Sequence, residues 1–435
     1  MARVGAETNY IITFLYFNDF IKKIDSLLQL LQSLGFCPVS RASCADFPTY
    51  LSSNQPVLLS GSSCGTDTWT SASSLLSRLG ADTPVPVEAA AGAYGASPIS
   101  TLPLSSFLAG QQGYLKDYRL PPQLAAQSYA LPACLCDDAL NPYLDGTQQP
   151  PPFRFLYAGF PGTRTALHHD ILLSHSWSCS LSGHKLWLLL SPQASEALLY
   201  PQGRYSAMAL DTLLPAPAAQ LLQGSLPCSS LPSTPLPQAW LDRLLAWVQA
   251  QPAGPPHLAA LVQPPGEVLF VPSGWHHEVV NLGPGLTLSL NHNWLSVCSG
   301  PALGAAWAFL SGELAEIRAR LQDCRGSADF PSLCERALRT DAGLGYTELA
   351  ELLCRKVGVL AAGAAGRGAA GVGAGSAAAV PPGQEERAAC SAESARAGLG
   401  HCARILRCIS LDAPSAAVQE QCRSSAALAE QALAE

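Results

Sequence analysis

Charged residues are scarce in this chain: Asp, Glu, Lys and Arg make up 13% of its 435 residues. Long apolar runs are missing as well, because no stretch approaches the roughly 18 uninterrupted apolar residues of a membrane span. The composition therefore predicts a soluble globular protein with no part in the membrane. The length suffices for one large domain or for about two or three smaller ones, each with its own core.

Clusters of Lys and Arg are absent too, and the formal net charge is -7. Neutralisation of nucleic-acid phosphates needs clustered cations, so the sequence argues against direct nucleic-acid binding. The start of the chain has no basic leader, because Glu7 precedes the apolar run from Tyr10 to Phe17 and polar residues follow it. We therefore expect a cytoplasmic protein, with the nucleus as the alternative.

Paired cysteine motifs are a third absence. The chain has 15 cysteines, but they are scattered, and Cys134 and Cys136 form the only close pair. Structural zinc sites and disulfide frameworks both depend on characteristic cysteine spacings. We therefore expect reduced thiols, with neither a zinc cluster nor a disulfide frame.

The first 120 residues indicate an α/β flank ahead of the main core. Apolar spacing predicts a helix over Asp19 to Leu34, a strand over Gln55 to Leu59 and a second helix over Trp69 to Leu79. The stretch from Leu120 to Pro152 is rich in proline and polar residues. We expect this stretch to wrap the surface.

From Phe153 the chain changes to short strands separated by turn residues, which indicates an all-β core within residues 121–299. Each predicted strand is about five or six residues long, as in barrels and sandwiches. A Pro-rich stretch at about 205–238 indicates an inserted loop, and a helix is expected from Ala239 to Ala250. The predicted strands are Phe153–Ala158, Lys185–Leu190, Glu267–Val271 and Leu286–Asn291.

Helical patterns return after Cys298, and an apolar stripe predicts a helical region over residues 300–360. Residues 361–383 are almost pure Gly and Ala, a composition that cannot bury a core and predicts a disordered linker. Residues 384–435 indicate two more helices, whose polar, Ala-rich faces predict weak packing. The stripe consists of Trp307, Leu310, Leu314, Ile317 and Leu321.

Seven of the nine histidines fall in two short windows. A His-x-Asp pair followed far downstream by another His is the ligand set of a facial triad, which holds non-heme Fe(II) in oxygenases. Side chains two apart in an extended segment point the same way, so the spacing selects His168 with Asp170 and leaves out His169. The spacing does not choose between His276 and His277. Taken alone, a His-x-Asp pair is most often a hydrogen-bonded surface pair, so the surrounding motifs matter.

Further motifs surround these histidines in a characteristic order. Together they closely resemble a JmjC domain, the double-stranded β-helix of Fe(II)- and 2-oxoglutarate-dependent oxygenases, in the branch that includes arginine demethylases and lysyl hydroxylases. The resemblance is strong over residues 153–294. It implies an α+β protein with a cupin-like jelly-roll core, N-terminal helices and strands, and a helical C-terminal region. The motifs are Phe160-Pro161-Gly162-Thr163, Thr165 to Ile171, Ser176-Trp177-Ser178, Gly183 to Pro192, Pro265 to His277, and Asn291 to Trp294.

The resemblance also implies a role for each matching residue. The third iron ligand follows a Gly-aromatic-aromatic run, which puts it on His277 and leaves His276 outside. Lys185, at the family's Gly-x-Lys position, would receive the far carboxylate of 2-oxoglutarate, since a buried Lys needs such a partner. Thr165 would donate a hydroxyl hydrogen bond to the same carboxylate.

Weaker matches extend the expected pocket. Asn291 or Asn293 would line it, since strand residues two apart share a face. Tyr114 would reach the cosubstrate carboxylate, as tyrosines do in related enzymes. Ser178 stands where some relatives carry an Asn, so that contact would be lost or mediated by water.

The resemblance implies that Fe(II), 2-oxoglutarate and dioxygen together hydroxylate an unactivated C–H bond, with succinate and carbon dioxide as products. The implied substrate is a protein, namely a lysine of a translation-termination release factor, and the oligomeric state stays open. One alternative is an N-methyl-lysine or N-methyl-arginine demethylase, although the chain has neither reader modules nor nuclear-localisation clusters. Another is an inactive β-helix scaffold, which would have no need to keep the iron ligands and Lys185.

Overall fold

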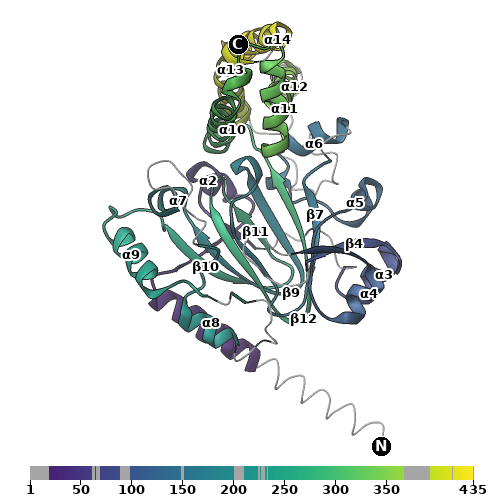
Figure 1. Cartoon of the computed structure of the whole chain (residues 1–435), viewed down its shortest axis with the longest axis vertical. Coiled ribbons are helices and arrows are strands. Elements are labelled where there is room, and N and C mark those ends of the chain that lie inside the picture. Colours follow the sequence, from purple (N-terminus) through teal and green to yellow (C-terminus); the bar gives the residue numbers. More distant parts are fainter. Residues whose placement is uncertain are drawn as a thin grey trace, which may run out of the picture.

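The computed structural model describes residues 19–60, 64, 69–88, 98–147, 151–199, 210–223, 226, 231–232, 234–366, 392–413 and 415–434. A β core lies in the middle of the molecule, and helices α10 to α14 cover one end of it (Figure 1). The strands are β1 (Cys37–Pro38), β2 (Ser40–Ala42), β3 (Val57–Leu59), β4 (Pro84–Glu88), β5 (Ile99–Pro103), β6 (Tyr114–Arg119), β7 (Arg154–Gly159), β8 (Arg164–His168), β9 (His175–Leu190), β10 (Leu258–Gln263), β11 (Val268–Val271) and β12 (His276–Trp294). The helices are α2 (Phe47–Ser53), α3 (Ala72–Leu79), α4 (Leu104–Gly110), α5 (Pro122–Ser128), α6 (Leu140–Gly146), α7 (Pro192–Leu199), α8 (Ala216–Gln223), α9 (Gln238–Gln249), α10 (Gly300–Arg320), α11 (Phe330–Ala342), α12 (Tyr346–Gly366), α13 (Ala392–Asp412) and α14 (Ala416–Ala434).

Two long strands build the β core. β9 and β12 run antiparallel along their whole length. On its outer edge, β9 pairs first with β11 and then with β10, whereas β12 pairs first with β8 and then with β7. Each long strand therefore takes part in both halves of the core. This is the double-stranded β-helix expected from the sequence, and that prediction is confirmed.

The predicted strand lengths are wrong for these two strands. β9 has 16 residues and β12 has 19, because the turn residues inside them do not end the strands. Gly183 within β9 has a φ of 70°, and a Cβ at this position would lie 2.4 Å from Oγ1 of Thr287 on β12. Glycine thus lets the two strands stay close at a bend where another residue would clash.

The flank and the inserted segment cover one side of the core. A helix over residues 19–33 agrees with the predicted N-terminal helix, and its Leu27 and Leu31 pack with apolar residues of β9 and α9. The prediction that residues 205–238 form only a loop is wrong, because α8 lies within them. Ala219 and Leu222 of α8 are buried in the same cluster, and this burial stabilises the helix. The prolines around α8 had suggested a loop.

The expectation that residues 120–152 wrap the surface is also wrong. α6 is largely buried, because its apolar residues join the core cluster of the C-terminal helices. Asn141 holds the segment in place, since its Nδ2 donates to the backbone oxygen of Asn293 at 2.8 Å and its Oδ1 accepts from the backbone N–H of Phe153 at 2.7 Å. Two buried hydrogen bonds therefore tie α6 to β12 and to the start of β7.

The last helices are tightly packed, contrary to the weak packing expected from their Ala-rich faces. α13 contacts α10, α12 and α14, and Leu399, Leu406 and Ile409 are buried in one cluster with α10 and α12. Small Ala residues allow close helix approach, so Ala-rich faces can pack well. α12 runs to Gly366, which is six residues into the predicted linker of residues 361–383. The rest of that linker lies outside the described residues.

One pair of cysteines corrects the prediction of reduced thiols throughout. Cys44 and Cys134 form a disulfide, with their Cα atoms 5.5 Å apart. Among the cysteines that the structure describes, this is the one disulfide pair, and the described residues contain no cysteine cluster that could hold zinc. Among the described helices, none combines the length and the apolar character needed to cross a bilayer.

Candidate active site

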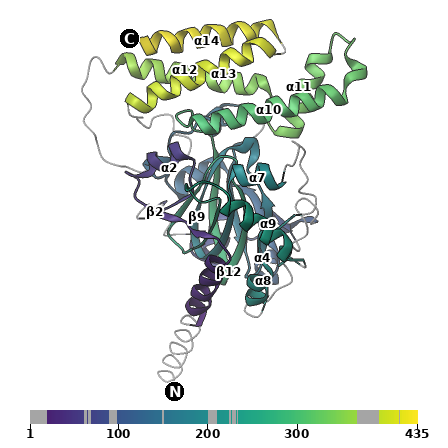
Figure 2. The same cartoon turned by 90° about the vertical axis from the view of Figure 1, so that its left-hand side faces the viewer.

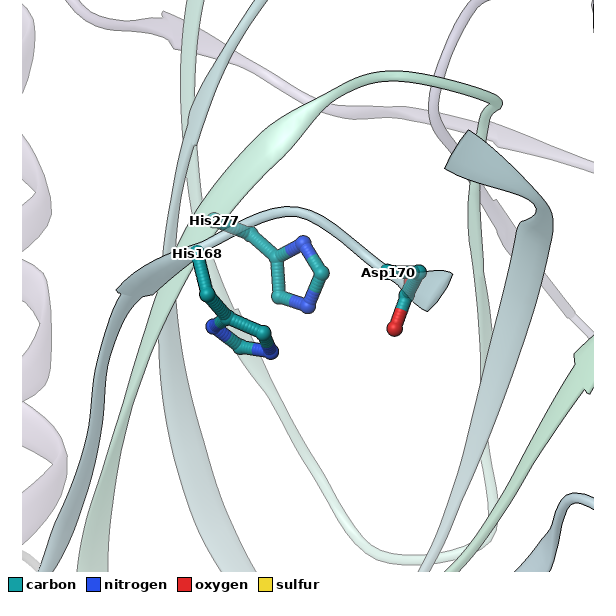
Figure 3. A group of neighbouring side chains, drawn as sticks. All are labelled: His168, Asp170 and His277. Carbon is teal, nitrogen blue, oxygen red and sulfur yellow. The ribbon is translucent and has the colours of Figure 1, made fainter. Parts of the chain in front are cut away.

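Three potential metal ligands converge at one end of the β core. His168 ends β8, Asp170 follows two residues later, and His277 lies near the start of β12, directly opposite His168 in the strand pairing. One ligand atom from each residue lies within 4.8 Å of the other two. Figure 3 shows the two imidazoles side by side, with the Asp170 carboxylate facing them across a gap. The structure thus brings together the three residues that the sequence analysis selected.

The orientation of both imidazoles suits metal binding. Nδ1 of His168 lies 2.8 Å from the backbone oxygen of Ala166, and Nδ1 of His277 lies 3.2 Å from that of Trp275. A backbone carbonyl at Nδ1 fixes the ring and its tautomer, so Nε2 is the nitrogen that could bind a metal. Desolvation lowers the pKa of His168 well below its ordinary value, and His277 adds to this effect. The ring is therefore neutral, as a metal ligand must be.

The neighbouring histidines contact each other and lie outside the group of potential ligands. His169 and His276 contact each other edge to face, with ring centroids 5.1 Å apart, and His169 also contacts Phe309 of α10. Neither residue belongs to the group of potential ligands. Each pair of neighbouring histidines thus contributes one ring to the ligand group and one ring to the contact between His169 and His276.

A cavity of about 440 Å³ extends from the three ligands into the β core. Lys185 lines it and is 1% exposed. Its Nζ donates to Oγ of Ser289 and lies 5.7 Å from the ring centroid of Tyr157, but no carboxylate of the described residues forms an ion pair with it. Burial lowers the pKa of Lys185 to about 7. A buried cation without an anion is costly, so this cavity fits a ligand that brings a carboxylate.

The hydroxyl groups of two residues line the same cavity as Lys185. Burial raises the pKa of Tyr114 above its ordinary value, and hydrogen bonds with Thr165 and Asn281 oppose this rise. Asn281 is the cross-strand partner of Lys185. Tyr114 and Thr165 both line the cavity, so the structure places these two predicted cosubstrate contacts where an anionic ligand could meet them.

The two asparagines near the end of β12 also line this cavity. Oδ1 of Asn291 accepts from Ser289 at 2.9 Å and from Ser178 at 3.2 Å. Asn293 is held by its backbone, which bonds to Phe153 and Asn141. Ser178 is not among the residues that line the cavity, and its hydroxyl donates to Asn291, which does line it. The structure therefore brings both Asn candidates to the cavity instead of one.

Several residues in or next to the cavity were missed by the sequence analysis. Asn281 and Ser289 lie in β12, and their closeness to Lys185 depends on the pairing of β12 with β9. Tyr157 donates to Asp117, which has a φ of 56° within the irregular pairing of β6 with β7. A local stretch of sequence does not show which residues of two distant strands pair. The alternation of side-chain direction within β7 and β12 is the signal that could have pointed to these residues.

Comparison with known proteins agrees with this geometry. The family model described as "Cupin-like domain" matches residues 45–300, which is more than half of the chain. The chain is 31% identical over 288 residues to "2-oxoglutarate and iron-dependent oxygenase JMJD4" of Danio rerio, covering 62% of this chain and 60% of the relative. It is 30% identical over 251 residues to "Arginine-specific demethylase JMJ20" of Arabidopsis thaliana, covering 54% and 46%.

A third relative is "Bifunctional arginine demethylase and lysyl-hydroxylase psr-1" of Caenorhabditis briggsae, which is 30% identical over 174 residues, or 40% of this chain and 36% of the relative. The chain thus spans less than two thirds of the length of these curated relatives. The segment matched by the family model contains both histidine windows. The chain therefore belongs to the cupin-like family, in its JmjC form.

Proposed function

We propose that this protein is an Fe(II)- and 2-oxoglutarate-dependent oxygenase. The observation that carries the proposal is the joint presence, in one cavity, of a two-His, one-carboxylate ligand set and a buried lysine with no ion-pair partner among the described residues. A facial triad of this composition suits non-heme Fe(II). The names of the JMJD4 relatives include the same metal, iron, and the same cosubstrate, 2-oxoglutarate.

Different residues of the cavity would bind the metal and the cosubstrate. His168, Asp170 and His277 would hold the metal, and Lys185 would bind the far carboxylate of 2-oxoglutarate, with Thr165 and Tyr114 as hydrogen-bond donors. Asn293 would line the cosubstrate pocket and contribute to cofactor binding. Iron, dioxygen and 2-oxoglutarate together supply the oxidation of an unactivated C–H bond, and 2-oxoglutarate becomes succinate and carbon dioxide.

The substrate we propose is a protein lysine, most specifically one in a translation-termination release factor, with the cytoplasm as the place of action. This choice rests on the likeness to the lysyl-hydroxylase branch and on the lysyl-hydroxylase activity named for the psr-1 relative. The second candidate is demethylation of methylated arginine or lysine, because two of the relatives are named arginine demethylases. A scaffold without activity is the third, and the retained ligand set argues against it.

Mass spectrometry separates these functions. The full chain with Fe(II), 2-oxoglutarate and ¹⁸O₂ should add one labelled oxygen to a lysine in a release-factor fragment. Loss of a methyl group from a methyl-arginine peptide, without stable oxygen gain, would favour the demethylase. Absence of both products, together with no succinate, would favour the scaffold.

A further inference from the structure

A second, larger cavity lies beside the metal site, between α10 and the rim of the β core. We call it the α10 cavity; its volume is about 1480 Å³, and residues of α10, α7 and the end of α2 line it. Figure 2 shows α10 lying across this end of the core, next to α2 and α7. His168 and His169 line both this cavity and the metal-site cavity. A molecule in the α10 cavity would therefore reach the metal ligands.

The charge of the α10 cavity has one sign. Glu196, Glu313 and Glu316 line it, whereas no Lys or Arg does. Within the part of the chain that the structure describes, none of the three carboxylates forms an ion pair. Glu313 and Glu316 lie three residues apart on one face of α10, and desolvation together with the neighbouring Glu316 raises the pKa of Glu313. A cation in this cavity would relieve that repulsion.

A buried hydroxyl points to a polar ligand in the same place. Ser195 of α7 lines the α10 cavity and is 2% exposed, and its Oγ has no hydrogen-bond partner among the described residues. Buried hydroxyls nearly always bond to protein, water or ligand. The apolar parts of the lining, such as Phe309 and Leu173, would cover the aliphatic stem of a long side chain.

We propose that the α10 cavity binds the segment of a protein substrate that flanks the target residue, and that this segment carries Lys or Arg side chains received by Glu313 and Glu316. The proposal rests on the proposed oxygenase function, because it assumes that the neighbouring metal site acts on a protein. It assigns α10 a part in substrate choice. The carboxylates, the unbonded Ser195 hydroxyl and the shared His168 and His169 together specify an extended basic peptide.

Peptide binding by fluorescence anisotropy tests this, using the 435-residue chain with Fe(II) and 2-oxoglutarate under anaerobic conditions. The probes are a labelled peptide with a central Lys flanked by Arg residues, and the same peptide with Glu in place of Arg. The wild type should prefer the basic peptide. The double variant Glu313→Gln/Glu316→Gln should bind it about five- to tenfold more weakly, whereas the control Glu393→Gln, an exposed change on α13, should leave binding unchanged.

Equal affinity of the wild type and the double variant would overturn the proposal, as would a wild type without preference for the basic peptide. A concentration-dependent dimer that the peptide fails to displace would assign the cavity to a second copy and would also overturn it. Succinate formation without peptide tests the oxygenase function separately. Charge-selective peptide binding without succinate would support the docking site and reject the proposed oxygenase.

Discussion

At the scale of single residues, neighbouring histidines have opposite roles. His168 faces the metal site, whereas His169 faces His276 and α10. We predict that His168→Ala lowers the affinity for Fe(II) or Co(II) more than about 100-fold. Mutating a residue that only hydrogen-bonds to a metal ligand already lowers metal affinity by about 10- to 100-fold, and removing the ligand itself should cost more. His169→Ala should keep wild-type affinity. Anaerobic metal titration measures both, and equal losses in the two variants would reject the ligand assignment.

The buried charge of Lys185 predicts how pH affects 2-oxoglutarate binding. Burial lowers the pKa of this lysine to about 7, and binding of the dianion needs the protonated form. Below this pKa, Lys185 of the free protein is already protonated, so the Kd for 2-oxoglutarate should not change with pH. Above it, the Kd should rise about tenfold per pH unit until the pH reaches the pKa that Lys185 has in the complex.

Calorimetric titration of 2-oxoglutarate between about pH 6 and pH 9 measures this slope. Lys185→Arg is the matched control, because arginine stays protonated throughout this range and should remove the slope. A wild type with constant affinity, or an arginine variant with the same slope, would mean that another group controls the pH dependence.

The same lysine should cost stability when the cosubstrate is absent. Lys185→Met replaces a buried charge with an apolar chain, so we predict a free energy of unfolding higher by about 1–4 kcal/mol. Binding of 2-oxoglutarate should weaken by about 2–5 kcal/mol in the same variant. Urea unfolding and calorimetry measure the two effects. A destabilised variant would show that Lys185 supports the fold instead of the ligand.

The convergence of His168, Asp170 and His277 could be predicted because the signals are local. The strand period selects His168 with Asp170, although the choice of His277 over His276 needed the family resemblance. Asn281 and Ser289 could not be found in this way, since their place beside Lys185 arises from strand register between distant segments.

At the scale of elements, the inserted segment holds β8 against β12. Nη2 of Arg164 on β8 lies 2.9 Å from the Asp211 carboxylate, and Nη1 lies 3.3 Å from Glu278 on β12. Glu278, which is 0% exposed, also accepts from Thr212 at 2.8 Å and from the backbone N–H of Leu213 at 2.7 Å. These contacts surround the site where the pairing of β8 with β12 changes register next to His277.

Loss of this ionic network should affect both stability and the metal site. Glu278→Ala removes one partner of a buried ion pair, so we predict a loss of about 3 kcal/mol in the free energy of unfolding and a metal affinity lower by about 10- to 100-fold. Thr212→Val removes only the hydroxyl and should cost about 1 kcal/mol. Urea unfolding and metal titration measure these effects. Unchanged metal affinity in a folded Glu278→Ala variant would limit the insert to a stabilising role.

The elements were predicted unevenly for a physical reason. The N-terminal helix and the strands near β7 and β11 follow from local spacing. α6 and α8 were missed because proline-rich surroundings suggest loops, and only burial against distant residues stabilises these short helices. The lengths of β9 and β12 were missed because glycine bends were taken as strand ends.

At the scale of the whole molecule, the C-terminal helices form one core with α10, which lines the α10 cavity. A chain ending at Gly366 would lose α13 and α14 and with them the burial of Leu399, Leu406 and Ile409. We predict a loss of more than about 4 kcal/mol in the free energy of unfolding from these side chains alone. Calorimetric unfolding of both chains measures this, and an unchanged transition would show that the two helices are dispensable.

The most direct test of the central claim is Fe(II)-dependent conversion of 2-oxoglutarate to succinate by the full chain. Succinate should form with the wild type and with His169→Ala, and it should be lost with Asp170→Ala, because only the last variant removes one of the three proposed metal ligands. Quantitative mass spectrometry of succinate gives the result. Equal succinate from the wild type and Asp170→Ala, or none from the iron-loaded wild type, would contradict the assignment of this site as a 2-oxoglutarate oxygenase centre.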